Sequence, residues 1–139
     1  MNSKIIFRSF QKGDYKTVNN WWKWWWKGEY IEREFLPSND SCFIIEKNNI
    51  PVVSGFLYLG KNAPIAYLTY IVSNPEYKEL DRREIIELLI NKIEEESKKL
   101  GVKLIFTVCG DRNLTNIHKK LDWYVHDNRQ SYESFKIIK

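Results

Sequence analysis

The chain has 139 residues, of which 43% are hydrophobic, 29% charged and 15% aromatic, and its formal net charge is +4. These values are typical of one globular domain over residues 1–139 and exclude a long disordered chain. No apolar run approaches the roughly 20 residues of a membrane-spanning helix, and the N-terminus lacks the apolar core of a signal peptide. We therefore expect a cytoplasmic protein with no membrane partner. The mild basic charge admits an anionic partner without requiring one.

The first elements are a strand and a tryptophan-rich helix. Residues 4–10 alternate apolar and polar side chains, as a strand does, and Gly13-Asp14 supplies a turn and an N-cap for a helix over residues 15–27. Five of the six tryptophans lie in the run NNWWKWWWKGEY, residues 19–30. A helical wheel places four of them on one arc with Val18, which predicts a buried face: Trp21, Trp22, Trp25 and Trp26. Trp24 lies on the polar side.

Three strands are predicted next, after an irregular connector over residues 28–40. Residues 41–47, 50–60 and 65–72 are apolar and follow one another through short turns. Asn48-Asn49 tolerates the left-handed backbone of a tight hairpin. These residues predict an antiparallel meander.

The C-terminal half alternates helices and strands. Residues 82–100 form a long helix closed by Gly101, with a buried stripe of Ile86, Leu89, Ile90, Ile93, Ser97 and Leu100. Residues 102–109 are nearly all apolar, which is typical of a central strand. A short helix over 111–121 and two final strands, a hairpin around 128–129, complete the order β-α-(turn)-β-β-β-α-β-α-β-β. This order predicts an α+β or mixed α/β fold, with helices on both faces of a mainly antiparallel sheet.

That order, together with the stretch IVSNPEYKELDRREIIELLINKIEEESKKLGVKLIFTVCGDRNLTNIHKKLDW, resembles the GCN5-related N-acetyltransferase superfamily, and in particular its short members from phage genomes. The resemblance is specific from about Tyr67 to Trp123. It implies the fold of that family, acetyl-CoA as cofactor, an amine acceptor and, for a phage-encoded protein, a location in the host cytoplasm.

The resemblance also implies a coenzyme A site. Val72 and Pro75 fit the family's V-x-x-P, and the strand Tyr70, Ile71 and Val72 would pair with the pantetheine amides. Both glycines of the family's R-x-x-G-x-G/A segment are replaced, by Asp81 and Arg83. Because those glycines let backbone N–H groups approach a pyrophosphate, we expect basic side chains to take over this contact: Lys78, Arg82 and Arg83. The alternative is that Asp81 caps the helix and the basic residues are solvated.

The catalytic positions follow from the second family motif, Y-x-x-x-G-F. With Asp122-Trp123 in place of Gly-Phe, the tyrosine position falls on His118, which could protonate the departing thiolate, because the pKa of histidine lies near 6.5. The alternative is a surface histidine. Relatives often carry an acidic residue mid-strand, where this chain has Thr69. The base would be water or one of four glutamates that the sequence does not distinguish: Glu29, Glu32, Glu34 and Glu46.

The acceptor site of the family is shaped by the first helix and its following loop. Here that region is the end of the tryptophan run and residues 28–37, so the expected substrate contacts are Trp24, Trp26, Glu29 and Tyr30. The acceptor is a small molecule, a protein or an amine-bearing nucleobase; nucleic acid as a partner would suit exposed aromatics beside basic residues.

Two alternatives to an active acetyltransferase remain open. The replaced glycines, His118 and Thr69 also fit a catalytically silent interaction module, and a salt-sensitive nucleic-acid binder is less favoured. Cys42 and Cys109 are expected as buried reduced thiols, with a Cys109–His118 nucleophile disfavoured, and no metal-ligand spacing is present. The oligomeric state is not indicated.

Overall fold

The computed structural model describes residues 3–109, 112–125, 136 and 138. The chain falls into two compact units that divide between Val108 and Cys109. The first unit contains the sheet and two helices, and the second contains the helix α3 (Arg112–Lys120). The single domain expected over residues 1–139 stays a prediction.

The sheet of the first unit has five strands in the order β1-β2-β3-β4-β5. The first four pair antiparallel and β5 pairs parallel to β4, which confirms the mixed, mainly antiparallel sheet. Asn48 and Asn49, with φ of 52° and 67°, form the tight turn of the β2–β3 hairpin as predicted. The strands are β1 (Ile5–Ser9), β2 (Cys42–Lys47), β3 (Ile50–Leu59), β4 (Ile65–Ser73) and β5 (Leu104–Phe106).

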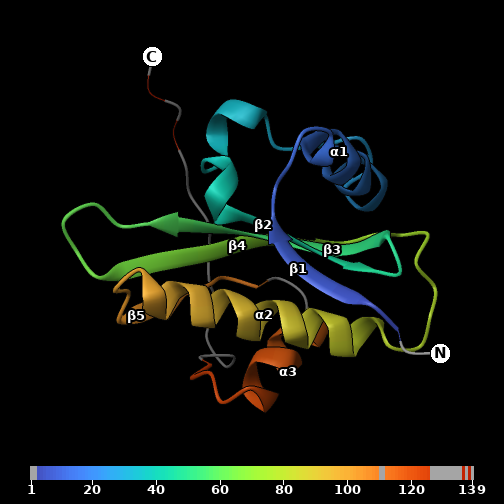
Figure 1. Cartoon of the computed structure of the whole chain (residues 1–139). Coiled ribbons are helices and arrows are strands. Elements are labelled where there is room, and N and C mark those ends of the chain that lie inside the picture. The colour runs from blue at the N-terminus through green and yellow to red at the C-terminus, as the bar shows by residue number, and fades with distance from the viewer. Residues whose placement is uncertain (1–2, 110–111, 126–135, 137, 139) are drawn as a thin grey trace. The chain divides into compact units, whose positions relative to one another are not determined.

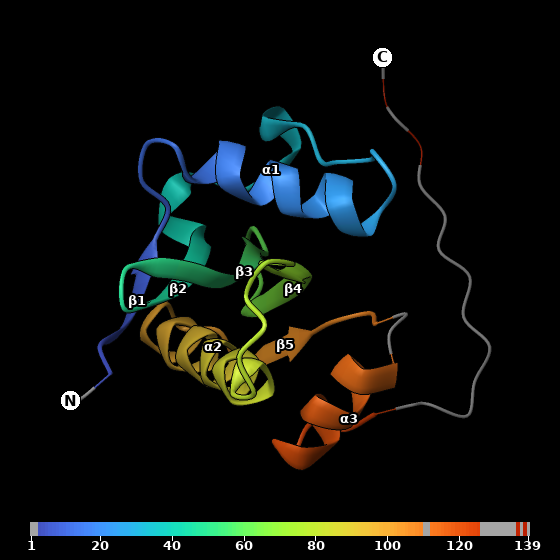
Figure 2. The same cartoon turned by 90° about the vertical axis from the view of Figure 1, so that its right-hand side faces the viewer.

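Helices cover both faces of this sheet, as Figures 1 and 2 show: α1 (Asp14–Trp25) lies on one face and α2 (Arg82–Lys99) on the other. On the α1 face, Val18 and Trp22 are fully buried and Trp22 packs on the ring of Phe56. Under α2, the side chains of Leu89 and Ile93 press on Gly55 of β3. Burial of these apolar surfaces is the main stabilising contribution to the unit.

The start of α1 differs from the predicted cap. Gly13, with φ of 95°, is the N-cap residue, and Asp14 is the first helical residue. The Asp14 carboxylate instead pairs with Arg8 at 2.6 Å and accepts the backbone N–H of Gln11 at 2.6 Å. Asp14 therefore ties the helix start back to β1, because a charged partner in the preceding strand is within its reach.

The long helix α2 matches its predicted extent, with two corrections to its buried stripe. Ile85 rather than Ile86 is buried, and Leu100 is exposed because it follows the last helical turn. Gly101, with φ of 82°, closes the helix: its N–H donates to Lys98 O at 3.1 Å, and the N–H of Val102 donates to Ser97 O at 3.0 Å. This is a Schellman motif, which confirms Gly101 as the C-terminal closure.

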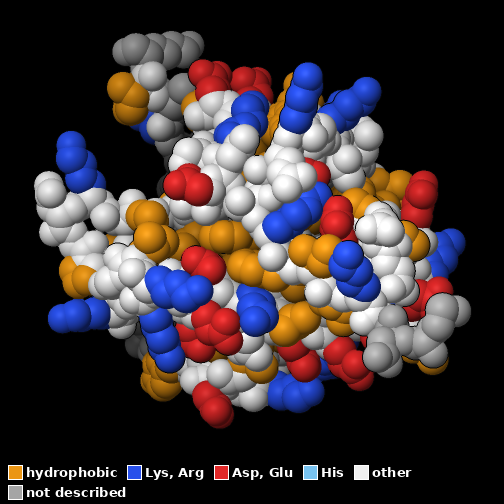
Figure 3. Space-filling model, in the orientation of Figure 1, with side chains coloured by type: hydrophobic (Ala, Val, Ile, Leu, Met, Phe, Trp, Pro, Cys, Tyr) orange, Lys and Arg blue, Asp and Glu red, His pale blue; other side chains and the backbone are white. Residues whose placement is uncertain are grey.

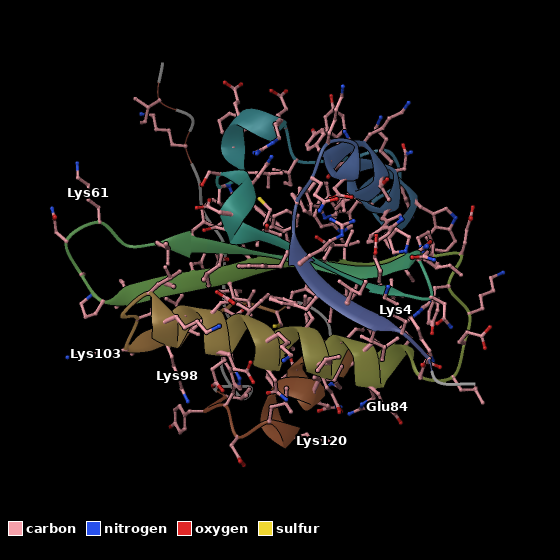
Figure 4. The ribbon with its side chains drawn as sticks, viewed as in Figure 1. Lys4, Lys61, Glu84, Lys98, Lys103 and Lys120 are labelled. Atoms are coloured by element: carbon pink, nitrogen blue, oxygen red, sulfur yellow. The ribbon has the colours of Figure 1, made fainter. Side chains whose placement is uncertain are left out.

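The charges at the ends of α2 follow its dipole only in part, because Arg82 and Arg83 share the first turn with Glu84. Glu84 in the first turn points away from the sheet, and Lys98 lies in the last turn (Figure 4). Acidic groups near the N-terminus and basic groups near the C-terminus each stabilise a helix.

The apolar segment after α2 is not the central strand that its composition predicts. Only Leu104–Phe106 is a strand, and β5 is the last strand of the sheet, with Leu104 and Phe106 about half exposed. Of the predicted final hairpin, residues 126–135 lie outside the described residues, and residues 123–125 are not strand. The connector between α1 and β2 holds two short 3-10 turns, η1 (Arg33–Phe35) and η2 (Asn39–Ser41).

Candidate active site

The edge of β4 opens beyond Tyr67. β4 pairs with β5 only through Ile65↔Leu104, Ala66↔Ile105 and Tyr67↔Phe106, whereas β4 itself continues to Ser73. Among the described residues no strand pairs with this remaining stretch on the β5 side. A strand edge of this kind presents backbone N–H and C=O groups to an extended ligand.

A side-chain hydrogen bond lies at the far end of the open edge. The N–H of Asn74 donates to Val52 O on β3 at 2.7 Å, so strand alternation directs the backbone of Ser73 toward the open edge. There the Ser73 carbonyl accepts the indole N–H of Trp25 at 2.8 Å. The end of α1 is thereby fixed to the edge of β4.

A β-bulge lies in the middle of this stretch. Ser54 pairs with Val72 and Phe56 with Thr69, so Tyr70 and Ile71 both lie opposite Gly55. Tyr70 has φ of 56°, a left-handed conformation that is strained for a large side chain. Its ring stands nearly edge-on to three aromatic rings at centroid distances of 6.3 to 6.4 Å, those of Trp22, Trp26 and Tyr58. Packing therefore holds the bulge in place.

The two faces beside the bulge differ in access. On the α2 face, a Cβ on Gly55 would lie only 3.2 Å from side-chain atoms of both Leu89 and Ile93. That face is closed by α2. Three of the expected contacts present only their backbone to the edge. The side chain of Ile71 is directed toward Gly55, that of Val72 is buried under α1, and that of Thr69 is buried opposite Phe56. A ligand can reach the bulge from the edge and from the α1 face beyond the end of α1.

An ion pair closes the loop at the start of α2. The carboxylate of Asp81 pairs with the ammonium of Lys47 at the end of β2 and accepts the hydroxyl of Tyr77 at 2.5 Å. Hydrogen bonds from Lys47 and Tyr77 lower the pKa of Asp81. The pKa of Tyr77 is raised to about 12, first by burial and then by its hydrogen bond to Asp81. Asp81 is the N-cap residue of α2, as the alternative expects, but its side chain makes no cap hydrogen bond. Asp81 lies instead in a small network beside the N-terminus of α2.

The basic residues expected at the N-terminus of α2 differ in whether their side chains turn inward or face the solvent. The guanidinium of Arg82 turns inward and donates to Tyr77 O, and to Asn74 O at 3.4 Å. Arg83 is half exposed, with Nε 3.8 Å from a carboxylate oxygen of Glu87, and Lys78 is exposed in the loop. Lys47 is the cation that sequence reasoning missed. It lies 34 residues from Asp81, and no local pattern links them.

The tryptophan run divides between core and surface. Trp21 and Trp22 are buried and Trp24 is 63% exposed, as predicted, but Trp25 and Trp26 are 42% and 36% exposed. The correction has a local cause: α1 ends at Trp25, and Lys27 and Gly28 take positive φ, so the helical wheel no longer applies. Trp26 nevertheless stacks on Trp22 with centroids 5.8 Å apart.

The other expected substrate contacts lie just after α1. Tyr30 is exposed, with the Lys23 ammonium 4.9 Å from its ring centroid, and Glu29 is exposed. Of the four candidate bases, Glu46 is paired with Arg8 at 2.8 Å, and Glu32 and Glu34 are exposed like Glu29. The structure brings Trp26 and Tyr70 together but gives no contact between Glu29 and either ring.

In the second unit, His118 is only 2% exposed. Its Nδ1 lies 2.8 Å from Leu114 O, so Nδ1 carries the proton and donates to that carbonyl. Its Nε2 is buried without a hydrogen-bond partner in the described structure. Burial lowers the pKa of His118, against the opposing effect of the Leu114 carbonyl. The alternative of a surface histidine is therefore wrong, and the neutral ring dominates at pH 7.

The cysteines and ionic groups add no further centre. Cys42 is buried, as expected, with its thiol pKa raised to about 11 chiefly by burial, and Cys109 is half-buried. Its Sγ lies 3.9 Å from Nδ1 of His118. Within the described residues no group of three His, Cys, Asp or Glu side chains is placed to hold a metal ion, and no helix is long and apolar enough to cross a membrane.

Charged side chains of both signs are interspersed around α2 in Figure 3. They do not form the single-signed surface typical of a nucleic-acid footprint. A nucleic-acid partner has no support from this face.

Sequence comparison gives a limited match. No family model matches the chain. An amino-acid acetyltransferase of Photorhabdus laumondii is 31% identical over 80 residues, which is 58% of this chain and 16% of that protein. The chain thus corresponds to a minor part of the length of this curated relative.

Structural comparison covers nearly the whole chain. An N-acetylglutamate synthase from Neisseria gonorrhoeae, complexed with coenzyme A and N-acetyl-glutamate, matches with a TM-score of 0.68 and 13% identity over 86% of this chain and 28% of that one. The aminoglycoside N-acetyltransferase AAC(6')-Iy in complex with CoA matches with a TM-score of 0.68 and 13% identity over 96% of this chain and 97% of that one. The chain therefore has the fold of the GCN5-related N-acetyltransferases, as its sequence predicts.

Proposed function

Because the chain has this fold, we propose that it is an N-acetyltransferase that transfers an acetyl group from acetyl-CoA to an amine. The observation that carries the proposal is the open edge of β4, with its bulge at Tyr70, beside the N-terminus of α2. The similar structures named above were determined with coenzyme A bound. An extended ligand with a phosphate at one end fits an edge of this kind next to a helix N-terminus.

The proposed reaction is direct attack of the amine nitrogen on the thioester carbonyl. The amine loses a proton, the new C–N bond forms, and the thiolate leaves and takes up a proton. Acetyl-CoA supplies the acetyl group. The chain itself would align the two substrates and stabilise the developing oxyanion with a backbone N–H from the stretch Tyr70–Val72.

Phosphate binding would rest on the N-terminus of α2 and its neighbouring cations. Arg83 and Lys78 are exposed, and Lys47 lies beside Asp81. Arg82 would act indirectly, because its guanidinium holds the loop carbonyls of Asn74 and Tyr77. The roles expected of His118, as proton donor to the thiolate, and of Thr69 stay predictions.

The test is thermal unfolding with and without acetyl-CoA. A ligand at 100 times its dissociation constant stabilises by about 2.7 kcal/mol, which is several degrees in Tm for a chain of this size. Asp81→Asn should increase the shift, because it removes a carboxylate from the phosphate position. Lys92→Gln, elsewhere on α2 in an exposed ion pair, is the control and should leave the shift unchanged. No shift at millimolar acetyl-CoA would contradict the proposal.

A catalytically silent binding module is the second candidate. The observation that favours it is the network of Asp81, Lys47 and Tyr77, because its carboxylate would repel a phosphate at the proposed position. Thiol release from acetyl-CoA in the presence of amines separates the two: a protein that binds the cofactor and releases no thiol with any amine fits the silent module.

The acceptor contacts proposed for this region are Trp24, Trp26, Glu29 and Tyr30. Trp26 has the strongest support, because it contacts Tyr70 at the bulge. A nucleic-acid acceptor would require binding that weakens steeply with salt, since each phosphate contact releases counterions. Oligonucleotide binding at 50 and 200 mM salt checks this.

A further inference from the structure

Five aromatic rings cross the α1 face of the sheet from the end of α1 to β5. Neighbouring rings contact one another in sequence, with centroid distances of 6.4, 6.4, 6.3 and 4.7 Å. We call this set the aromatic row: Trp26, Tyr70, Tyr58, Tyr67 and Phe106. Trp26 and Phe106 at its ends are 36% and 46% exposed, and the three tyrosines are half-buried.

The row passes through the β4 bulge. Tyr70, its second member, is the bulged residue, and Tyr67 is the last residue of β4 that pairs with β5. The opposite face at the bulge is closed, because Leu89 and Ile93 of α2 pack directly on Gly55. A second substrate that meets a ligand on the open edge must therefore approach over the aromatic row.

The surroundings of Tyr58, at the centre of the row, carry little charge. The charged or titratable neighbours that act on the Tyr58 hydroxyl are Tyr70, Cys42, Tyr67 and Arg33, of which only Arg33 carries a charge at pH 7. The Tyr58 hydroxyl itself donates to Phe35 O at 2.6 Å. The ion-paired carboxylates of the described structure lie elsewhere, at Asp14, Glu46, Asp81, Glu87, Glu95 and Glu96, whereas Glu29, Glu32 and Glu34 are exposed in the loop after α1. A site that binds polyamines needs carboxylates to pair with each ammonium.

We propose that the acceptor is an amine carried on a planar aromatic group, an arylalkylamine in chemical class, and that the aromatic row is what selects it. This inference rests on the proposed function for the position of the reacting edge. Aromatic rings prefer offset-stacked or edge-on contacts with other rings, and ring faces also attract an aminium group. A saturated ring of the same size has the same apolar bulk but lacks the flat π-face, so comparing the two isolates the contribution of the row.

The experiment is isothermal titration calorimetry of three amines into the protein, with and without saturating coenzyme A: 2-phenylethylamine, 2-cyclohexylethylamine and spermidine. We expect 2-phenylethylamine to bind about two- to tenfold more tightly than 2-cyclohexylethylamine, the range that one aromatic contact gives, and spermidine to bind most weakly. Tyr67→Leu should bring the ratio of the first two dissociation constants to about one. Phe7→Leu, the same kind of exchange at a ring that stacks on Phe43 in β2, should preserve the ratio.

Four outcomes would each overturn the inference. They are binding of 2-cyclohexylethylamine that equals or exceeds that of 2-phenylethylamine, tighter binding of spermidine than of 2-phenylethylamine, a ratio of dissociation constants that is unchanged in Tyr67→Leu, and no binding of any amine. Because the readout is amine binding, it is independent of turnover. Absent stabilisation by acetyl-CoA would instead contradict the proposed function, so the two failures are distinguishable.

Discussion

The indole N–H of Trp25 donates a hydrogen bond to the carbonyl oxygen of Ser73 at 2.8 Å and so joins the last residue of α1 to the last residue of β4. Trp25→Phe keeps a ring and removes this donor. We expect it to lower the free energy of unfolding by about 0.5–1.5 kcal/mol, the usual contribution of one hydrogen bond. Urea unfolding measures the loss. Lys16→Gln, an exposed change near the start of α1, is the control, and an equal effect of both would contradict the assignment.

Two neighbouring tryptophans should differ strongly in their contribution to stability. Trp22 is fully buried against Phe56 and Tyr70, so Trp22→Ala should cost about 3–5 kcal/mol. Trp24 contacts Trp25 and is mostly exposed, so Trp24→Ala should cost about 1 kcal/mol or less. Comparable losses in chemical denaturation would show that the run does not divide as described.

The Asp81–Lys47 pair should give stability that acid removes. The folded state lowers the pKa of Asp81 below its ordinary value of 3.8, so the unfolded chain binds the proton first as the pH falls. The contribution is fully present above about pH 4 and is lost as the pH falls through the folded pKa. The difference in unfolding free energy between wild type and Asp81→Asn should therefore shrink between pH 6 and pH 3. Lys47→Gln should show the same trend, and a difference independent of pH would contradict the pair.

Burial of His118 predicts a second, separate pH effect. Its folded pKa lies below the ordinary 6.5, so the unfolded chain gains a proton near pH 6.5 while the folded ring stays neutral. Stability is present above that pH and is lost progressively as the pH falls toward the folded pKa. We expect wild type to be less stable at pH 5.5 than at pH 7.5 and His118→Phe to lose most of this dependence. His126→Gln, which removes the other histidine, is the matched control; if it alone abolished the dependence, the effect would not belong to His118.

The two helix C-termini offer a matched pair of backbone tests. Asp122, with φ of 67°, closes α3 as Gly101 closes α2: the N–H of Asp122 donates to Lys119 O at 3.1 Å, and the N–H of Trp123 to His118 O at 3.0 Å. Glycine adopts this conformation without strain, so Asp122→Gly should stabilise by about 0.5–1 kcal/mol. Gly101→Ala should destabilise by about 1 kcal/mol although its Cβ would meet no atom within 4 Å. Unfolding midpoints of both variants check this, and a shift in the same direction would contradict it.

Local periodicity predicts most elements of the fold because each helix and strand buries one face. The wheel correctly separates Trp22 from Trp24, which both lie within α1. It fails for Trp25 and Trp26, because the end of a helix depends on backbone turns that hydrophobicity does not encode. The apolar composition of residues 102–109 also misleads, since an end strand such as β5 can be as apolar as a central one.

The candidate site is harder to predict because its decisive contacts join residues far apart in the chain. Asp81 alone suggests a helix cap, and only the fold shows that Lys47 reaches it. The aromatic row likewise combines Trp26, the residue after α1, with rings from β3, β4 and β5. The bulge at Tyr70 leaves no sequence signal, because a tyrosine within an apolar strand is ordinary.

The extra residue at that bulge changes which face of the sheet the following side chains of β4 point to. In a regular strand, Thr69 and Val72 would point to opposite faces, because they are three residues apart. Here Thr69 lies opposite Phe56, and Val72 packs in the same cluster as Phe56, so both belong to the α1 side. Removing Tyr70 would leave Thr69 and Val72 two positions apart, so in a regular strand both would still point to the α1 side. A one-residue deletion at Tyr70 should therefore replace the bulge with regular pairing and keep Val72 buried, so that the loss falls on the aromatic contacts of Tyr70.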